Sequence, residues 1–200
     1  IDPAQVGAVA ISVTATGGAG PGYLVASAPC AGSAPETSNV NYAGFDSSAL
    51  PYHPYLVADQ QSKDMIDALT AARSALPTAA APATTDGGRL FITGYSQGGY
   101  VAMATHRAMQ SAGMTVTASA PMSGPYAMAA FVDAAFSGRV SSGATVSFTL
   151  LMTAYQKAYG NVYSGTAEVF EAQYANGIES LLPSTTPRSV LYAQGKLPKD

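Results

Sequence analysis

The stretch from Arg89 to about Ala112 constrains the fold more than any other part of the chain. An apolar run, Leu90-Phe91-Ile92-Thr93, leads directly into Gly94-Tyr95-Ser96-Gln97-Gly98, and helix-type sequence follows. A strand, a tight turn and a helix in this order can hold a serine hydroxyl exposed at the head of the helix. Glycine is needed on both sides because a Cβ would crowd so sharp a turn. The sequence therefore predicts Ser96 as a candidate nucleophile on a strand-to-helix turn.

Ser96 has two interpretations. In the first it is a nucleophile, and the backbone N–H of Gln97 supplies one half of an oxyanion hole, assisted by the dipole of the helix that follows. In the second it is a serine that merely caps that helix. We favour the first because strand, turn and helix occur in the required order. Gly99 is then expected to let the helix pack closely against the sheet.

Periodicity predicts further elements before and after this turn. Short runs rich in β-branched residues predict strands at 8–13, 22–26 and 114–118. A helix is expected from Asp59, with Asp59 or Ser62 as N-cap and Pro77 as its end. Its apolar stripe consists of Met65, Leu69, Ala72 and Leu76. Asp86-Gly87-Gly88 predicts a turn before the strand that carries Ser96, and Gly113 is expected to close the helix after Ser96.

The character of the sequence changes after Pro121. The segments 126–136, 146–159 and 166–175 all have helical character, with no strand between them. Three consecutive helices suggest an insertion packed over a sheet. Because the strand, turn and helix around Ser96 resemble the nucleophile turn of α/β-hydrolases, we predict an α/β-hydrolase core at residues 1–125, a mainly parallel sheet flanked by helices, and a helical cap or lid at 126–200. The core is expected to be incomplete at its C-terminus.

A serine hydroxyl needs a general base, which in turn needs an orienting acid. The chain has two histidines. His106 lies on the helix that Ser96 opens, about 15 Å away at 1.5 Å per residue, and is expected to be a solvated helix residue. His53 precedes Ser96 in a Pro-Tyr-His-Pro-Tyr loop, where a loop anchor or pocket wall is the favoured role. The base is thus predicted to lie outside these 200 residues.

The acid is equally ambiguous. The acidic residues after Ser96 fall in the helical stretch, where solvated helix charges are the simpler interpretation, or at the end of the chain. They are Asp133, Glu168, Glu171, Glu179 and Asp200.

Composition excludes several classes of function. Charged residues make up 10% of the chain and the net charge is −3, so no basic surface is available for nucleic acid. No run of about 18 apolar residues occurs, so no membrane span is expected. One cysteine and two distant histidines predict no metal site, and no organic cofactor is expected. Cys30 is interpreted as a half-buried thiol, and a start at Ile1 without Met indicates a processed or partial product.

The residues resemble the secreted bacterial lipases and esterases of the α/β-hydrolase superfamily, with the most specific match from Asn41 to about Tyr126. The stretches that carry the resemblance are Asn41-Tyr42-Ala43-Gly44-Phe45-Asp46, Leu50-Pro51-Tyr52-His53-Pro54-Tyr55-Leu56, Asp59-Gln60-Gln61-Ser62, Gly94-Tyr95-Ser96-Gln97-Gly98-Gly99, Ser119-Ala120-Pro121-Met122-Ser123-Gly124-Pro125-Tyr126, and Leu191-Tyr192-Ala193-Gln194-Gly195-Lys196-Leu197-Pro198. The turn around Ser96 also resembles that of cutinases, which ranks lower because cutinases carry disulfides and a downstream Asp and His.

The resemblance implies that Ser96 forms an acyl-enzyme, that a cap covers the acyl pocket, and that acid and histidine follow beyond Asp200. Tyr95, Tyr42 and His53 are candidate substrate-binding residues. The family's His-Gly-Thr-like oxyanion strand has no counterpart in residues 14–40. Three explanations stay open: the chain is truncated, ordered pieces have been joined, or a second chain supplies the missing Asp and His.

The predicted function is hydrolysis of carboxylic esters or acylglycerols by a secreted or periplasmic enzyme of lipid degradation. A peptidase or an acyltransferase on the same turn is an alternative, because the pocket selects leaving group and acceptor. A hydrolase-fold fragment without activity is a third, motivated by the missing histidine.

Overall fold

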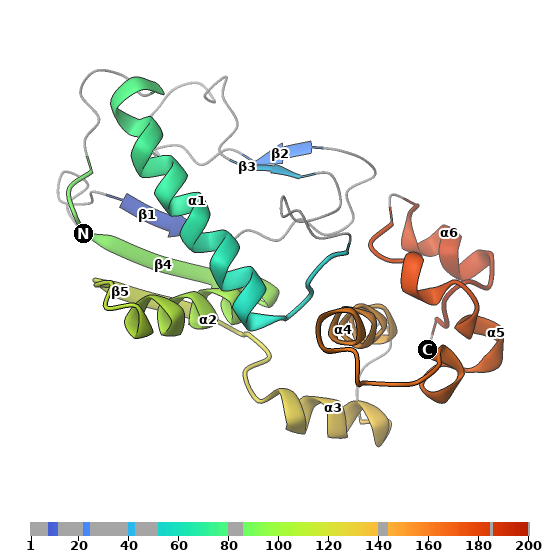
Figure 1. Cartoon of the computed structure of the whole chain (residues 1–200). Coiled ribbons are helices and arrows are strands. Elements are labelled where there is room, and N and C mark those ends of the chain that lie inside the picture. Colours follow the sequence, from blue (N-terminus) through green and yellow to red (C-terminus); the bar gives the residue numbers. More distant parts are fainter. Residues whose placement is uncertain are drawn as a thin grey trace. The chain divides into compact units, whose positions relative to one another are not determined.

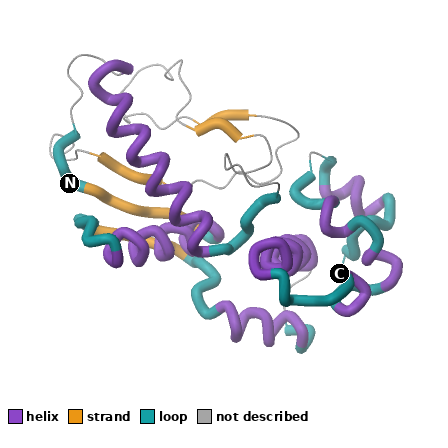
Figure 2. Tube along the Cα trace, viewed as in Figure 1, coloured by secondary structure: helices purple, strands orange, loops and turns teal. Residues whose placement is uncertain are grey.

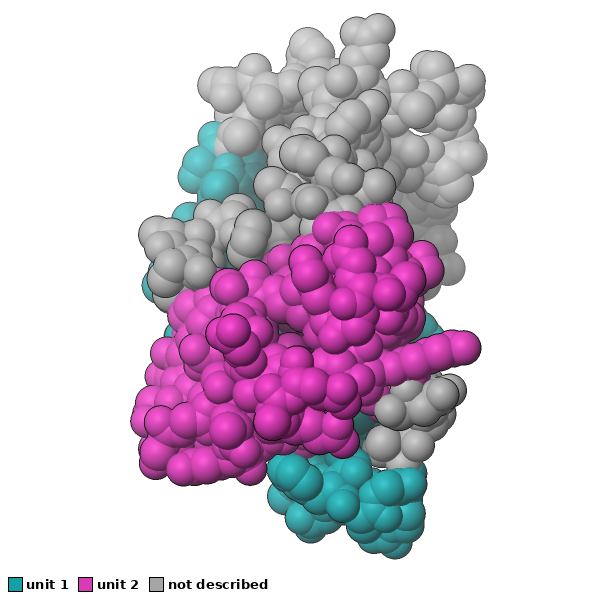
Figure 3. All heavy atoms as spheres, turned by 90° about the vertical axis from the view of Figure 1, so that its right-hand side faces the viewer, with its two compact units in different colours: residues 1–14, 55–139 teal, residues 15–54, 140–200 magenta. Residues whose placement is uncertain are grey.

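The computed structural model describes residues 8–11, 22–24, 40–42, 52–79, 86–139, 144–184 and 186–199. The chain forms two compact units, which are coloured separately in Figure 3. Unit 1 combines residues 1–14 with 55–139, and unit 2 combines residues 15–54 with 140–200. Each unit therefore joins two stretches that are distant in sequence. A domain boundary at residue 125 stays a prediction.

Unit 1 is built on a three-stranded parallel sheet in the order β1-β4-β5, with β1 at Ala8–Ile11, β4 at Leu90–Tyr95 and β5 at Ala118–Met122. The register places Ala8 opposite Leu90 and Phe91 opposite Ala118. Figures 1 and 2 show the central strand β4 between its two neighbours. The predicted parallel sheet flanked by helices is confirmed.

Helices α1 (Ala58–Ala79) and α2 (Gln97–Ser111) supply the core of unit 1. Leu90 and Ile92 on β4 pack with Leu69 of α1 and with Ala102 and Met109 of α2. Because one cluster joins both helices to alternate residues of β4, both helices cover the same face of the strand. A third helix, α3 (Met128–Phe136), follows β5 and buries none of its residues.

The ends of α1 differ from the prediction, whereas the end of α2 agrees with it. Helix α1 begins at Ala58, so Asp59 lies in its first turn instead of at the cap, and the helix continues past Pro77 to Ala79. Pro77 therefore lies in the last turn of α1 and does not end the helix, although it cannot donate a helical hydrogen bond there. Gly113 has φ 71° and follows Ala112, the C-cap of α2.

The closure of α2 is a Schellman motif. Gly113 N–H donates to the carbonyl of Gln110 at 3.1 Å, and Met114 N–H donates to that of Met109 at 2.8 Å. Met114 also packs against the cluster that contains Met109. The apolar contact that usually accompanies this motif is therefore present.

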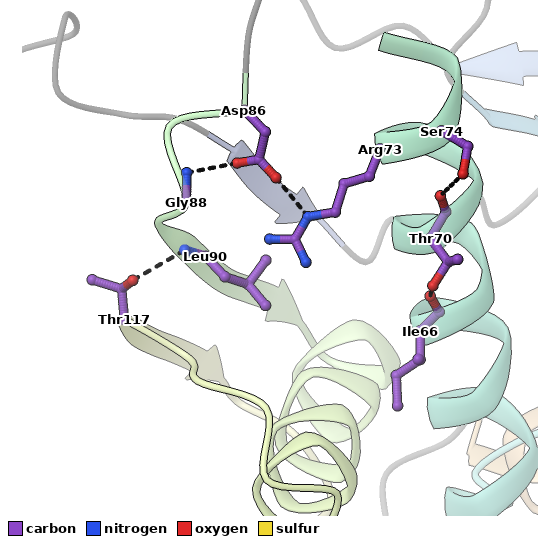
Figure 4. Close-up of polar contacts among 8 residues, drawn as sticks. All are labelled: Ile66, Thr70, Arg73, Ser74, Asp86, Gly88, Leu90 and Thr117. Carbon is purple, nitrogen blue, oxygen red and sulfur yellow. Dashed lines mark hydrogen bonds and ion pairs between the residues drawn. The ribbon is translucent and has the colours of Figure 1, made fainter. Parts of the chain in front are cut away.

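The strand predicted at 114–118 is misplaced, because the strand is β5 at Ala118–Met122. The alternating apolar residues of the predicted segment do not form a strand. Two of them, Met114 and Val116, pack against the core of unit 1. Thr117 then starts the pairing with β4. Its N–H donates to the carbonyl of Leu90 at 2.8 Å, and its Oγ1 accepts the Leu90 N–H at 3.0 Å (Figure 4).

The turn predicted at Asp86-Gly87-Gly88 is confirmed and is tied to α1. Asp86 Oδ1 accepts the N–H of Gly88 at 2.8 Å, Gly88 has φ 74°, and Arg73 Nε donates to Asp86 Oδ2 at 2.6 Å (Figure 4). The Gly88 N–H and the Arg73 guanidinium hold the pKa of Asp86 below its usual value. This contact links the last part of α1 to the entry of β4.

Unit 2 contains an antiparallel pair, β2 (Gly22–Leu24) and β3 (Val40–Tyr42), and a run of helices. These helices are α4 (Ala144–Tyr159), η2 (Thr166–Glu168), α5 (Ala172–Ala175), η3 (Ile178–Ser180) and α6 (Arg188–Ala193). Their core consists of Val146, Ile178, Leu191 and Leu197, with Phe170 packed against it.

The helix predicted at 166–175 is divided into η2 and α5. Glu171 has an extended ψ of 144°, which ends one helical turn and starts the next. The break brings Phe170 against the unit 2 core and into an edge-to-face contact with Tyr163. Packing of one aromatic side chain thus outweighs local helical periodicity.

Candidate functional site

Ser96 occupies a strained backbone conformation at the junction of β4 and α2. The strand ends at Tyr95, the helix begins at Gln97, and Ser96 between them has φ 56° and ψ −121°. A non-glycine residue at positive φ is uncommon and is often found at functional sites. Ser96 is solvent-exposed, and its side chain makes no capping hydrogen bond. The interpretation of Ser96 as a simple helix cap therefore lacks the contact that it requires.

Two glycines make this junction possible, one on each side of Ser96, and the second is the glycine that the sequence predicted to let the helix pack closely against the sheet. A Cβ on Gly94 would overlap the backbone carbonyl of Gly98, and a Cβ on Gly99 would overlap the backbone carbonyl of Met122 on β5. The first contact tightens the turn, and the second brings α2 against the sheet. Both neighbours are backbone atoms, so no side-chain adjustment could relieve the overlap.

The neighbouring strand holds the turn in place. Ser96 N–H donates to the carbonyl of Met122 at 3.0 Å, and Tyr100 N–H donates to the carbonyl of Ser96 at 3.1 Å. One bond belongs to the sheet and the other to the first turn of α2. Both backbone polar groups of Ser96 are therefore held by hydrogen bonds, and its side-chain hydroxyl does not take part in either of them.

Gln97 and Tyr95 flank the candidate nucleophile directly. Gln97 is the first residue of α2 and is buried, so its backbone N–H lies at the N-terminus of that helix, directly after Ser96. This placement is compatible with the oxyanion role predicted for its N–H. Tyr95 is 67% exposed and lies opposite Met122 in the register, and Met122 is also exposed. Both roles stay predictions.

Tyr42 and His53, the other two predicted substrate-binding residues, belong to unit 2. Tyr42 is the last residue of β3, where it pairs with Gly22, and its side chain lies outside the described residues. His53 is half-buried in the loop before α1. Their participation at Ser96 stays a prediction.

His106 is not the solvated helix residue that we expected. It is half-buried on α2, and its Nδ1 lies 2.8 Å from Ser119 Oγ on β5. Its distance from Ser96 follows from the continuous helix between them, ten residues at about 1.5 Å each. His106 therefore links helix to sheet and does not reach the candidate nucleophile.

The acidic candidates take varied positions. Asp133 is exposed on α3, as expected, and Asp200 lies outside the described residues. The side chain of Glu168 accepts the Ser164 N–H at 2.9 Å, and that of Glu171 accepts from Gln173 Nε2 at 3.0 Å. Both side chains are exposed, as expected, and each accepts a hydrogen bond from a residue two to four positions away.

Glu179 departs furthest from that expectation. Its Oε1 accepts a hydrogen bond from the hydroxyl of Tyr163 at 2.7 Å, and its backbone carbonyl accepts from Lys157 Nζ at 2.7 Å. Burial, the hydrogen bond to Glu179 and the negative charge of Glu179 raise the pKa of Tyr163. Lys157 and Glu179 also line a cavity of about 430 Å³ within unit 2, together with Thr166 and residues 175–178 and 180. This cluster is structural to unit 2 and does not include Ser96.

Sequence reasoning missed one unusual residue beside the turn. Ser123, the first residue after β5, has φ 50° and is exposed. Its only sequence signal is its place before Gly124-Pro125, which indicates a turn but not a positive φ at the serine.

No group of three or more His, Cys, Asp or Glu side chains could hold a metal ion in the part of the chain that the structure describes. Within the same residues, every helix is too short or too polar to cross a membrane.

The structure is similar to crystal structures of the rice cell wall degrading esterase LipA from Xanthomonas oryzae. A ligand-bound form aligns with a TM-score of 0.66 at 31% identity, over 76% of this chain and 40% of that chain. Another LipA structure aligns with a TM-score of 0.65 at 34% identity and the same coverages, 76% and 40%. The chain has an α/β-hydrolase-like fold. It spans about two fifths of the length of these esterases.

A candidate hydrolase from Legionella pneumophila also aligns, with a TM-score of 0.61 at 23% identity, over 80% of this chain and 42% of that chain. At this identity the likeness concerns the fold alone. No protein-family model and no curated protein sequence matches the chain significantly.

Proposed function

We propose that this chain carries the nucleophile of a serine hydrolase that cleaves carboxylic esters through an acyl-enzyme on Ser96. The observation that carries the proposal is the exposed Ser96 at φ 56°, held between β4 and α2 without a capping bond. The likeness to LipA esterases supports an ester as the substrate class. Strain at a functional serine is stable only when the surroundings fix it, as Gly94, Gly99 and Met122 do here.

The proposed reaction has two halves. Ser96 Oγ attacks the carbonyl carbon of the ester while a base takes its proton, and the carbonyl oxygen becomes an oxyanion beside the Gln97 N–H. The intermediate collapses, the C–O bond to the alcohol breaks, and the alcohol leaves with the proton. Water then attacks the acyl-serine in the same way, which releases the carboxylic acid and restores Ser96.

The base of this reaction is proposed to come from outside the 200 residues. His106 is about 15 Å from Ser96 along α2, which leaves it out of reach. A histidine and its acid on a further segment or a second chain would complete the site. We also propose that the enzyme acts outside the cytoplasm on an ester or acylglycerol, as the resemblance to secreted lipases and esterases implies.

A fluorophosphonate probe tests the proposal, because it labels only activated serines. We expect labelling of the natural protein, assayed together with the segment or chain that supplies its base, and loss of labelling in Ser96→Ala. The matched control is Ser111→Ala, which changes an exposed serine at the far end of the same helix and should leave labelling intact. Absence of labelling in the natural protein would refute the proposal and favour a hydrolase-fold protein without activity.

Two further measurements decide between the alternatives. A series of p-nitrophenyl esters compared with peptide anilides separates an esterase from a peptidase, and faster cleavage of the anilides would overturn the ester assignment. The intact mass of the purified protein and of any chain that copurifies with it shows whether a further segment or a second chain is present to supply the base. A mass above that of 200 residues, or a second chain that contains histidine, is the expected result.

A further inference from the structure

A second strained serine lies beside the first. Tyr95 and Met122 are opposite each other in the parallel register, so the residues that follow them, Ser96 and Ser123, are neighbours across the ends of β4 and β5. Adjacent strands lie about 4.8 Å apart. Ser96 has φ 56° and Ser123 has φ 50°. Two non-glycine residues in the left-handed region therefore stand side by side at the same edge of the sheet.

The backbone on both sides of Ser123 is fixed to the turn that carries Ser96. Before it, the Met122 carbonyl accepts the Ser96 N–H at 3.0 Å. After it, Gly124 lies so close to the start of α2 that a Cβ would stand 2.6 Å from the backbone nitrogen of Tyr100. Tyr126 N–H donates to the Gly124 carbonyl at 2.9 Å and closes the loop. The Cα of Ser123 therefore has a defined place beside Ser96.

A glycine would adopt the backbone conformation of Ser123 without strain. The chain places a serine there, and the next residue, Gly124, shows that glycine is used in this loop where backbone contact requires it. Strained backbone conformations persist where the surrounding structure fixes them, and they cluster at functional sites. The Ser123 side chain is exposed, so a small molecule from solvent can reach its hydroxyl.

We propose that Ser123 is a substrate-binding residue whose hydroxyl donates a hydrogen bond to the ester group held at Ser96. The inference rests on the proposed function and adds a residue to it. Ser123 follows the residue that pairs with Tyr95, and its side chain is exposed, so its hydroxyl is close enough to contact an ester bound at Ser96. The strained but doubly anchored backbone supplies the fixed geometry that a specific hydrogen bond needs.

Two variants separate binding of substrate from a role in folding, because both remove the hydroxyl but only one of them relieves the backbone strain at φ 50°. Ser123→Gly removes both the hydroxyl and the strain, so its Tm should equal or exceed that of the natural protein. Ser123→Ala removes the hydroxyl but keeps the strain, so its Tm should be equal or lower. Loss of one hydrogen bond to the ester should lower kcat/KM about tenfold in both variants.

The experiment measures Tm, fluorophosphonate labelling and p-nitrophenyl ester hydrolysis for the natural protein and both variants. A similar loss of kcat/KM in both, with Ser96 still labelled, supports the inference. Retention of activity by either variant overturns it, because activity would then follow backbone strain or flexibility instead of the hydroxyl. If the natural protein is neither labelled nor active, the proposed function itself fails and takes this inference with it.

Discussion

A Cβ on Gly94 would overlap the backbone carbonyl of Gly98, four residues later and on the other side of Ser96. The strand thus turns into the helix so tightly that its last glycine touches the first turn of α2. This contact explains why glycine stands two residues before Ser96, at the start of the stretch Gly94–Gly98. A longer side chain at the first glycine would have to open the turn that presents the hydroxyl.

Gly94→Ala is therefore expected to lower the free energy of unfolding by about 2–4 kcal/mol, because backbone atoms cannot move aside as side chains do. Labelling of Ser96 by a fluorophosphonate should be lost even in the fraction that remains folded. Urea denaturation and probe labelling at low temperature measure the two effects. Gly88→Ala is the control: a Cβ at Gly88 has nothing within 4 Å, although its φ of 74° adds a smaller strain, and labelling should persist.

Gly99→Ala tests the second close contact. A Cβ at Gly99 would overlap the carbonyl of Met122, the same atom that accepts the Ser96 N–H. The substitution should push α2 away from β5 and weaken that hydrogen bond, with a loss of about 1–3 kcal/mol. Hydrogen exchange at the Ser96 amide is the informative measurement. Unchanged protection at this amide, in a variant of normal stability, would contradict the close packing.

The elements nearest Ser96 were predictable because local and tertiary preferences agree there. The apolar run 90–93 is a good strand sequence whose alternate residues Leu90 and Ile92 are buried. Gly94, Gly99 and Gly113 each occupy a backbone position that excludes a side chain or requires positive φ. Where one residue type is dictated by backbone geometry, its presence in the sequence is informative.

Elsewhere tertiary contacts overrode local pattern. The alternation at 114–116 reflects packing of Met114 and Val116 on the core, and contact with β4 begins only at Thr117, the residue before β5. The carboxylate of Glu179 looks solvated in sequence because its partner, Tyr163, is 16 residues away. The positive φ of Ser123 could not be predicted from the local sequence, because a serine followed by Gly124-Pro125 is compatible with several turn types.

His106→Ala should leave the reactivity of Ser96 unchanged and lower stability. The substitution removes the contact between His106 Nδ1 and Ser119 Oγ, which joins α2 to β5, at a cost of about 1 kcal/mol. Ser119→Ala should cost a similar amount. In the double variant the two losses should not add, with a coupling of about 0.5–1.5 kcal/mol by urea denaturation. A large drop in probe labelling with normal stability would instead assign His106 a role at Ser96.

The buried pair Tyr163–Glu179 makes the stability of unit 2 sensitive to high pH. The side chain of Tyr163 is 7% exposed, and burial together with Glu179 raises its pKa above the usual value near 10. Below pH 10 the phenol keeps its proton in both folded and unfolded chains, so its contribution is fully present. Above pH 10 the unfolded chain loses the proton first, so the free energy of unfolding falls as pH rises.

Tyr163→Phe should therefore have two measurable effects. At neutral pH it removes the hydrogen bond to Glu179 and costs about 1–2 kcal/mol. Between pH 10 and 11 it should flatten the decline of stability by up to about 1.4 kcal/mol per pH unit, the contribution of one proton. Tyr159→Phe is the matched control, because Tyr159 is 55% exposed and ends the same helix that carries Lys157. Urea denaturation at several pH values across this range measures the effect. If both variants flatten the fall in the free energy of unfolding equally, the folded chain does not hold the Tyr163 proton more tightly than that of an exposed tyrosine.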